Sequence, residues 1–197
     1  MKTILFLFLT LLVLPVSKMN SQPLPDTLAI LIRTSAGDIH AELYTAKAPV
    51  TCLNFFMYTG AVGREGGEFY RTVTLQNQPD KKVLIEVIQG GFNLTHYDTT
   101  LIQPIPLERT SVTGLLHKNG TLSMARSDPD SGTTEFFICI NDQPSLDFGG
   151  NRNPDGQGFA AFGLVTGGME VVKKIQQSPA RGQSLSPPVK ILEILAE

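Results

Sequence analysis

The chain has 197 residues, a length typical of one domain with a sizeable hydrophobic core. Its 16 Lys and Arg residues and 18 Asp and Glu residues give a net charge of -2, and no run of like charge is long enough for a nucleic-acid-binding arm. The two Cys residues exclude a disulfide-rich scaffold and a Cys-rich zinc module.

Residues 1–21 resemble a secretory leader. Lys2 precedes an apolar run from Ile4 to Val16, which is shorter than the about 20 residues that span a bilayer. We therefore expect a cleaved signal peptide, export to the periplasm or the extracellular space, and a mature domain over residues 22–197. The alternative is an uncleaved N-terminal membrane anchor, because no clear small-x-small cleavage site follows the run.

The first elements predicted after the leader are a β-hairpin and a helix. Apolar residues fill 28–34 and alternate with polar ones over 39–44, on either side of a turn at 36–38. Pro49 and the helical spacing of Val50, Leu53 and Met57 predict an amphipathic helix over 48–59, ended by Gly60.

Short β-type runs dominate the rest of the chain. Strands are predicted at 68–73, 83–89, 121–124, 135–140, 159–165 and 189–195, and a second helix at 168–177. About eight strands without strand–helix alternation predict a mainly β fold, an eight-stranded antiparallel closed β-barrel capped by two α-helices. The polar segments 74–82 and 149–158 and the long, mixed segment 93–114 are expected to be loops.

Common metal and catalytic motifs fit this chain poorly. Residues 151–156 imitate the start of a calcium loop, but Phe162 stands where a bidentate Glu is needed. The three His residues have no ligand spacing, so we expect no metal and no cofactor. Export would permit a disulfide between Cys52 and Cys139, although two free, buried thiols are favoured by their apolar neighbours.

Five strand-borne segments together resemble the cyclophilin-type peptidyl-prolyl cis-trans isomerases. The resemblance covers about residues 27–197, and the family's eight-stranded barrel with two helices agrees with the elements predicted above. The segments are Phe69-Tyr70-Arg71, Val87-Ile88-Gln89-Gly90-Gly91-Phe92, the run 120–126, Glu135-Phe136-Phe137-Ile138 and the run 159–163.

The resemblance implies a set of site residues. Arg71 matches the family's catalytic arginine, and Gln89 matches the glutamine that orients the arginine and the substrate. Positions matching the substrate-binding surface, with the proline pocket at its centre, are Val87, Ala125, Arg126, Glu135, Phe137, Leu146 and Phe159. Phe162 is assigned to the barrel core.

Several positions depart from the family pattern. Glu86 replaces an aromatic residue of the pocket wall, and Ser145 lies at or beside the position of a Trp. If Glu86 lines the pocket, it should disfavour acidic residues near the proline and tolerate basic ones. Arg126 replaces a backbone-binding Asn, and its alternative role is an ion pair with Glu135 or Asp128.

The function implied is isomerisation of X-Pro bonds in proline-containing polypeptides, by a monomer without a nucleic-acid partner. Rotation about an amide must cross a barrier of about 18–20 kcal/mol, and a fixed donor such as Arg71 would stabilise the twisted state. The alternative is a non-catalytic module that binds proline-containing segments. A ligand-carrying barrel is a third reading, but it needs an open interior.

Overall fold

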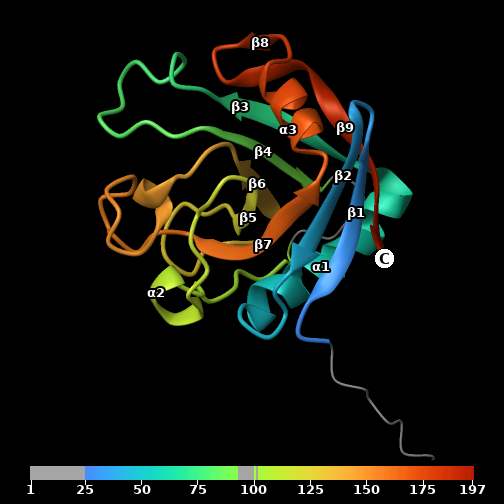
Figure 1. Cartoon of the computed structure of the whole chain (residues 1–197), viewed down its shortest axis with the longest axis horizontal. Coiled ribbons are helices and arrows are strands. Elements are labelled where there is room, and N and C mark those ends of the chain that lie inside the picture. Colours follow the sequence, from blue (N-terminus) through green and yellow to red (C-terminus); the bar gives the residue numbers. More distant parts are fainter. Residues whose placement is uncertain (1–24, 93–99, 101) are drawn as a thin grey trace, which may run out of the picture.

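The computed structural model describes residues 25–92, 100 and 102–197. Within these residues, nine strands form one antiparallel sheet in the order β1-β2-β7-β5-β6-β4-β3-β9-β8, and β1 also pairs with β9. That pairing closes eight strands into the predicted barrel, while the two-residue β8 extends the sheet beyond β9 (Figure 1). The strands are β1 (Leu28–Thr34), β2 (Gly37–Leu43), β3 (Gly67–Val73), β4 (Val87–Phe92), β5 (Thr121–Met124), β6 (Glu135–Cys139), β7 (Ala160–Gly167), β8 (Ala180–Arg181) and β9 (Ser184–Ala196).

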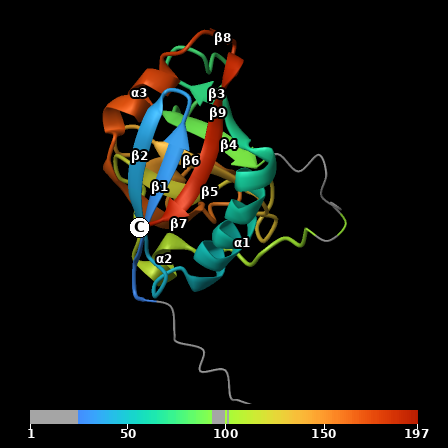
Figure 2. The same ribbon diagram turned by 90° about the vertical axis from the view of Figure 1, so that its right-hand side faces the viewer.

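Both predicted helices are present. Helix α1 (Pro49–Glu65) packs against β9, β4 and β7, and α3 (Met169–Gln176) packs against β2, β3 and β4. Figure 2 shows them on opposite sides of the barrel. Helix α1 continues past Gly60, where we expected it to end, because one glycine costs a helix only about 1 kcal/mol. No helix in the described part of the chain is long and apolar enough to cross a membrane.

Two further short helices lie in segments that were expected to be irregular or were left unassigned. Helix α2 (Thr110–Thr113) has four residues, and the 3-10 helix η2 (Pro144–Leu146) has three. Such short turns leave no helical periodicity in the sequence, which is why no pattern predicted them.

The strand expected at 83–89 is the element that differs most from the structure. It begins at Val87 and continues through two glycines to Phe92. The Gln78 side chain binds the backbone of Ile85 through N–H···O contacts of 2.8 and 3.3 Å, so the backbone of Ile85 needs no partner strand. Gly90 suits the strand because a Cβ there would lie 2.6 Å from the carbonyl oxygen of Glu68.

The barrel interior is filled by aromatic rings. Phe55 of α1 lies 5.2 Å from both Phe136 and Phe162, measured between ring centroids, and 5.6 Å from Phe92. Phe162 is completely buried, so its assignment to the core is confirmed. A barrel packed in this way has no room for the small apolar ligand that the third reading required.

The outer face of the barrel carries a second hydrophobic cluster. Along β6, Phe136 and Ile138 belong to the interior core, while the alternate residues Phe137 and Cys139 belong to this outer cluster. Its buried members are Val73, Ile85, Val87, Phe137, Cys139 and Leu146, with Ala125 and Phe159 packed against them. Cys52 lies in the interior core instead, and both cysteines are buried and free, as favoured above.

Candidate active site

Strand register brings the predicted catalytic residues together on the outer face of the barrel. Arg71 of β3 lies opposite Gln89 of β4, and Gln89 lies opposite Phe137 of β6. A surface groove crosses these strands, and every predicted site residue except Leu146 lines it: Arg71, Val87, Gln89, Ala125, Arg126, Glu135, Phe137 and Phe159.

A β-bulge in β3 turns two consecutive side chains toward Gln89. The register shifts between Phe69 and Arg71, so Tyr70 and Arg71 together face one residue of β4. Arg71 Nη1 donates to Gln89 Oε1 over 2.7 Å, and Gln89 Nε2 donates to Tyr70 Oη over 2.7 Å. Both ends of the Gln89 amide are therefore engaged, which fixes its orientation.

The guanidinium of Arg71 is held from its other side by Gln183, a residue that sequence reasoning missed. Gln183 Oε1 accepts from Arg71 Nε at 2.9 Å and from Nη2 at 2.7 Å, while its Nε2 donates to the carbonyl of Asn77 at 3.0 Å. An arginine has five N–H donors, so two remain without an acceptor among the described residues. Gln183 follows Gly182 in the β8–β9 turn, a polar position that carries no sequence signal for a role 112 residues away.

Glu135 is bound by neutral donors rather than by an arginine. Gln89 Nε2 donates to its Oε2 over 2.7 Å, and the Tyr70 hydroxyl donates to the same oxygen. Burial raises the pKa of Tyr70 above its ordinary value, and the hydrogen bond and charge of Glu135 raise it further. Tyr70 therefore stays protonated, and the chain Tyr70–Glu135–Gln89 supports the amide that orients Arg71.

Apolar side chains form the wall beside Arg71. Phe137 and Phe159 meet edge to face, with ring centroids 5.4 Å apart and planes at 89°. Leu146 is completely buried in the cluster beneath them and does not line the groove. It supports the wall from behind by filling the volume under Phe137.

A buried hydrogen-bonded chain of Ser123, His117 and Asp147 lies behind Phe137. The His117 ring is 2.7 Å from Asp147 Oδ1 through Nδ1 and 2.9 Å from Ser123 Oγ through Nε2. Ser123 is 0% exposed, so no substrate reaches its hydroxyl and the chain has a structural role. The imidazole stacks on Phe137 at 6.1 Å, which makes it a support for the apolar wall.

Arg126 forms an ion pair, but with neither of the two expected partners. Its Nη1 and Nη2 donate to the two carboxylate oxygens of Asp155 at 2.8 and 2.9 Å, and its Nε donates to the carbonyl of Gly158 at 2.8 Å. The guanidinium carbon also lies 5.1 Å from the centre of the Phe159 ring. The expected pairing with Glu135 or Asp128 is wrong because the loop 149–158 folds back over Arg126 and supplies a bidentate acid.

Glu86 and Ser145 do not line the groove. Glu86 Oε2 accepts from Asn141 Nδ2 at 2.8 Å, so the carboxylate is held at a different part of the surface. Ile85 and Val87, on either side of Glu86, line the groove instead. The interpretation of Glu86 as a pocket wall is therefore corrected, and with it the expected discrimination against acidic peptides.

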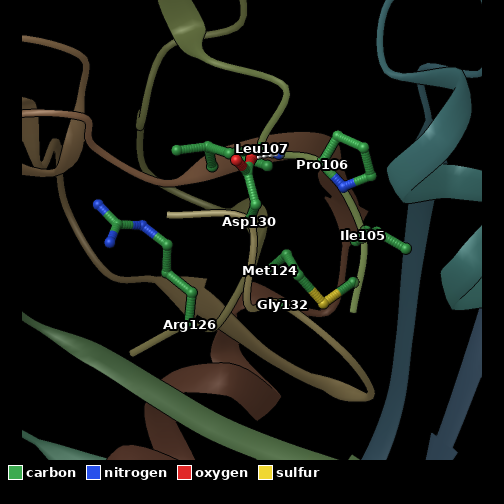
Figure 3. Close-up of a pocket in the computed structure, with 8 residues that line it drawn as sticks. Ile105, Pro106, Leu107, Met124, Arg126, Asp130 and Gly132 are labelled. Carbon is green, nitrogen blue, oxygen red and sulfur yellow. Dashed lines mark hydrogen bonds between the residues drawn. The ribbon is translucent and has the colours of Figure 1, made fainter. Parts of the chain in front are cut away.

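A smaller recess adjoins the groove at Arg126 (Figure 3). Met124 lines it, and Figure 3 shows the guanidinium of Arg126 pointing away from Met124. Its far side is the segment of Ile105 and Leu107. The N–H of Ile105 donates to Gly132 O at 2.9 Å, and the N–H of Leu107 donates to Asp130 Oδ1 at 2.7 Å.

In the part of the chain that the structure describes, no group of His, Cys, Asp and Glu residues could hold a metal ion.

Comparison with known proteins identifies the family of this chain. The model of the family "Cyclophilin type peptidyl-prolyl cis-trans isomerase/CLD" matches residues 29–195. A peptidyl-prolyl cis-trans isomerase of Acinetobacter baylyi is 34% identical over 169 residues, covering 83% of this chain and 82% of the relative. Peptidyl-prolyl cis-trans isomerase B of Escherichia coli is 35% identical over 148 residues, covering 75% of this chain and 83% of the relative.

Solved structures support the fold. A cyclophilin type peptidyl-prolyl cis-trans isomerase of Cryptosporidium parvum, determined in the presence of the dipeptide Ala-Pro, has a TM-score of 0.65 at 21% identity. The match covers 86% of this chain and 98% of that structure. On the family match and the bacterial relatives, the chain belongs to the cyclophilin-type peptidyl-prolyl cis-trans isomerases and is an enzyme of that class.

Proposed function

We propose that Arg71 is the catalytic residue and that it acts by donating a hydrogen bond to the twisting X-Pro amide. Isomerisation breaks no covalent bond, but it removes amide resonance and so must cross a barrier of about 18–20 kcal/mol. In the twisted state the nitrogen becomes pyramidal and basic, and charge on the carbonyl oxygen shifts. A donor fixed beside these atoms stabilises the twisted state more than either planar state.

One observation carries this assignment. Gln89 and Gln183 hold the Arg71 guanidinium from two sides, and two of its N–H groups have no acceptor among the described residues that line a groove whose wall is Phe137. Fixing the donor in advance removes the cost of ordering it during the reaction. Arginine suits the task because its planar fork can be braced by neighbours while one edge faces the substrate.

The apolar wall supplies the second part of the mechanism. We assign the proline ring to the surface formed by Phe137, Phe159, Val87 and Ala125, which offers it no hydrogen-bonding group. With the ring held there, the acyl side of the bond is the part that rotates. The substrates are therefore proline-containing polypeptides.

The test is a protease-coupled isomerisation assay on a short proline peptide. Arg71→Ala should lower kcat/KM by about 100-fold, the effect of removing one donor to a developing charge. Arg71→Lys should recover little, because an ammonium cannot bridge Gln89 and Gln183 as the guanidinium does. Full activity in Arg71→Ala would reject the assignment, and peptide binding without turnover in the unmodified protein would support the binding-module alternative, which the relatives do not favour.

We also propose that residues 1–21 direct export and that the domain 22–197 works as a monomer outside the cytoplasm. The short basic start and the apolar run of the leader support the proposed export. N-terminal sequencing after cell fractionation, with light scattering of the purified domain, tests both statements. A full-length chain in the membrane fraction would indicate the anchor instead.

A further inference from the structure

The groove beside Arg71 has an excess of positive charge. Four cations line it, namely Arg71, Lys81, Arg126 and Arg152, against one carboxylate, Glu135. Arg126 is neutralised by Asp155 in a bidentate pair, and Glu135 is bound to Tyr70 and Gln89. Within the described residues, the other three cations form no ion pair, so the groove keeps a net positive field.

Arg152 is the cation whose position is best defined. Its Nη1 donates to the carbonyl of Val83 at 2.6 Å, and its backbone N–H donates to the carbonyl of Ser145 at 3.1 Å. Nearby, the ion pair of Arg126 and Asp155 fastens the same loop to the groove. Arg152 is therefore a half-buried, positioned charge at the groove rather than a mobile surface side chain.

Arg152 and Arg71 line the same groove. Burial lowers the pKa of Arg152 from its ordinary value, and the positive charge of Arg71 lowers it further. All three hydrogen bonds of Arg71 with Gln89 and Gln183 are to neutral amide oxygens, which do not cancel its charge. Two like charges held together in this way are relieved when an anion enters between or beside them.

We propose that this groove selects peptides with a carboxylate side chain on a residue flanking the proline, and that Arg152, with Lys81, determines this selectivity. The inference rests on the isomerase function proposed above and names its substrate class. It also reverses the sign expected from Glu86, whose carboxylate is bound to Asn141 away from the groove. The recognising groups are full charges, so the preference depends on ionic strength.

The experiment compares two peptide series, Ala-X-Pro-Ala and Ala-Ala-Pro-X, with X as Glu, Gln or Lys. Isomerisation is followed by NMR exchange at low and high salt, which avoids the sequence preference of a coupling protease. We expect kcat/KM for Glu to exceed that for Gln by about two- to fivefold in at least one series, and Lys to be the poorest, the size of effect that partly exposed ion pairs produce. Arg152→Gln should reduce the Glu-to-Gln ratio toward one, as should high salt.

Matched variants separate charge from structure. Arg152→Lys keeps the charge and should keep the preference, while Lys81→Gln should weaken it without touching the Val83 contact. Lys47→Gln removes an equal charge from a different recess and should leave the ratio unchanged. Equal rates for Glu and Gln in both series, or a Glu preference that survives Arg152→Gln together with Lys81→Gln, would overturn the proposal. Failure of the isomerase function looks different, because no peptide would then be turned over or Arg71→Ala would have no effect.

Discussion

Gln183 offers the sharpest test of how this site works, because it touches Arg71 and lies at the turn between β8 and β9. Gln183→Ala removes two of the three hydrogen bonds that the protein makes to the Arg71 guanidinium and leaves the one to Gln89. The charge and the donor stay in the groove, but the donor loses its fixed orientation. Gln183 is thus a positioning residue, and its removal should lower kcat more than it raises KM.

The expected size follows from the cost of ordering the freed side chain again. Immobilising one long side chain costs about 0.5–1.5 kcal/mol, which corresponds to about a two- to tenfold lower kcat/KM. The effect must stay well below the about 100-fold expected for deleting the donor itself in Arg71→Ala. Loss of the bond from Gln183 Nε2 to Asn77 O should cost about 1 kcal/mol of folding free energy, or about 2–4 °C in Tm.

A double-mutant cycle distinguishes positioning from a general disturbance of the fold. In an Arg71→Ala background, Gln183→Ala should have no further effect on the rate, since there is no guanidinium left to position. Gln183→Glu keeps an acceptor oxygen facing Arg71 and should stay within about twofold of the unmodified enzyme. If Gln183→Ala retains full kcat, or if its effect adds to that of Arg71→Ala, the reasoning from the bracing contacts is refuted.

Three further outcomes follow from the same structure. Phe137→Leu should raise KM more than it lowers kcat, because the Phe137 ring forms the apolar wall with Phe159, at 5.4 Å between ring centroids, whereas Arg71 is the donor. Steady-state kinetics would measure the two effects separately. Asp155→Asn should be less stable than the unmodified protein at pH 7 but not at pH 2, as measured by urea unfolding at both pH values. The hydrogen bond with Arg126 lowers the pKa of Asp155 in the folded protein from its ordinary value of 3.8. The ion pair therefore contributes its full stability above pH 3.8, and this contribution is lost as the pH falls through the lowered pKa of the folded protein. Burial raises the pKa of Cys52 to about 12 and raises the pKa of Cys139 above its ordinary value, so neither thiol should react with a thiol reagent at pH 8. The free energy of unfolding should decline above about pH 9, because the two thiols ionise there in the unfolded state only. Labelling of both thiols in the native protein would contradict this.

The alternation of apolar and polar residues predicted the strands whose bounds are determined by residues close in sequence. The hairpin strand at 28–34 and the strand at 121–124 agree with the structure residue for residue, because alternation and turn residues determine such elements. The strand predicted at 83–89 is misplaced because the residues before Val87 are apolar without forming a strand. Ile85 belongs to the outer cluster, and a glutamine side chain replaces the strand partner of its backbone.

Some residues of the candidate site could be predicted from the sequence and one could not. The family motifs predicted that Arg71, Gln89 and Phe137 lie together, and the structure places them on the neighbouring strands β3, β4 and β6. Gln183 could not be predicted, since its contact with Arg71 exists only after the β8–β9 turn folds against β3. A single polar residue after a glycine contains no information about which distant charge it will meet.

The sign of the electrostatic potential at the groove differs between the sequence-based prediction and the structure. The family resemblance puts Glu86 in the pocket wall and so predicts negative potential at the proline pocket, but Glu86 does not line the groove and its carboxylate is held by Asn141. The positive potential of the groove comes instead from Arg71, Lys81 and Arg152. The loop of Arg152 is held there by its contacts with Val83 and Ser145 and by the ion pair of Arg126 and Asp155. The ion pair therefore has two effects: it helps to hold the loop that carries Arg152, and it neutralises Arg126, which lowers the positive charge of the groove. Asp155→Asn should therefore lower stability at pH 7 but raise the Glu-to-Gln ratio of kcat/KM, because it leaves the charge of Arg126 in the groove uncompensated while Arg152 keeps its contacts with Val83 and Ser145. A lower ratio in that variant would show that Arg152 needs the ion pair to keep its place.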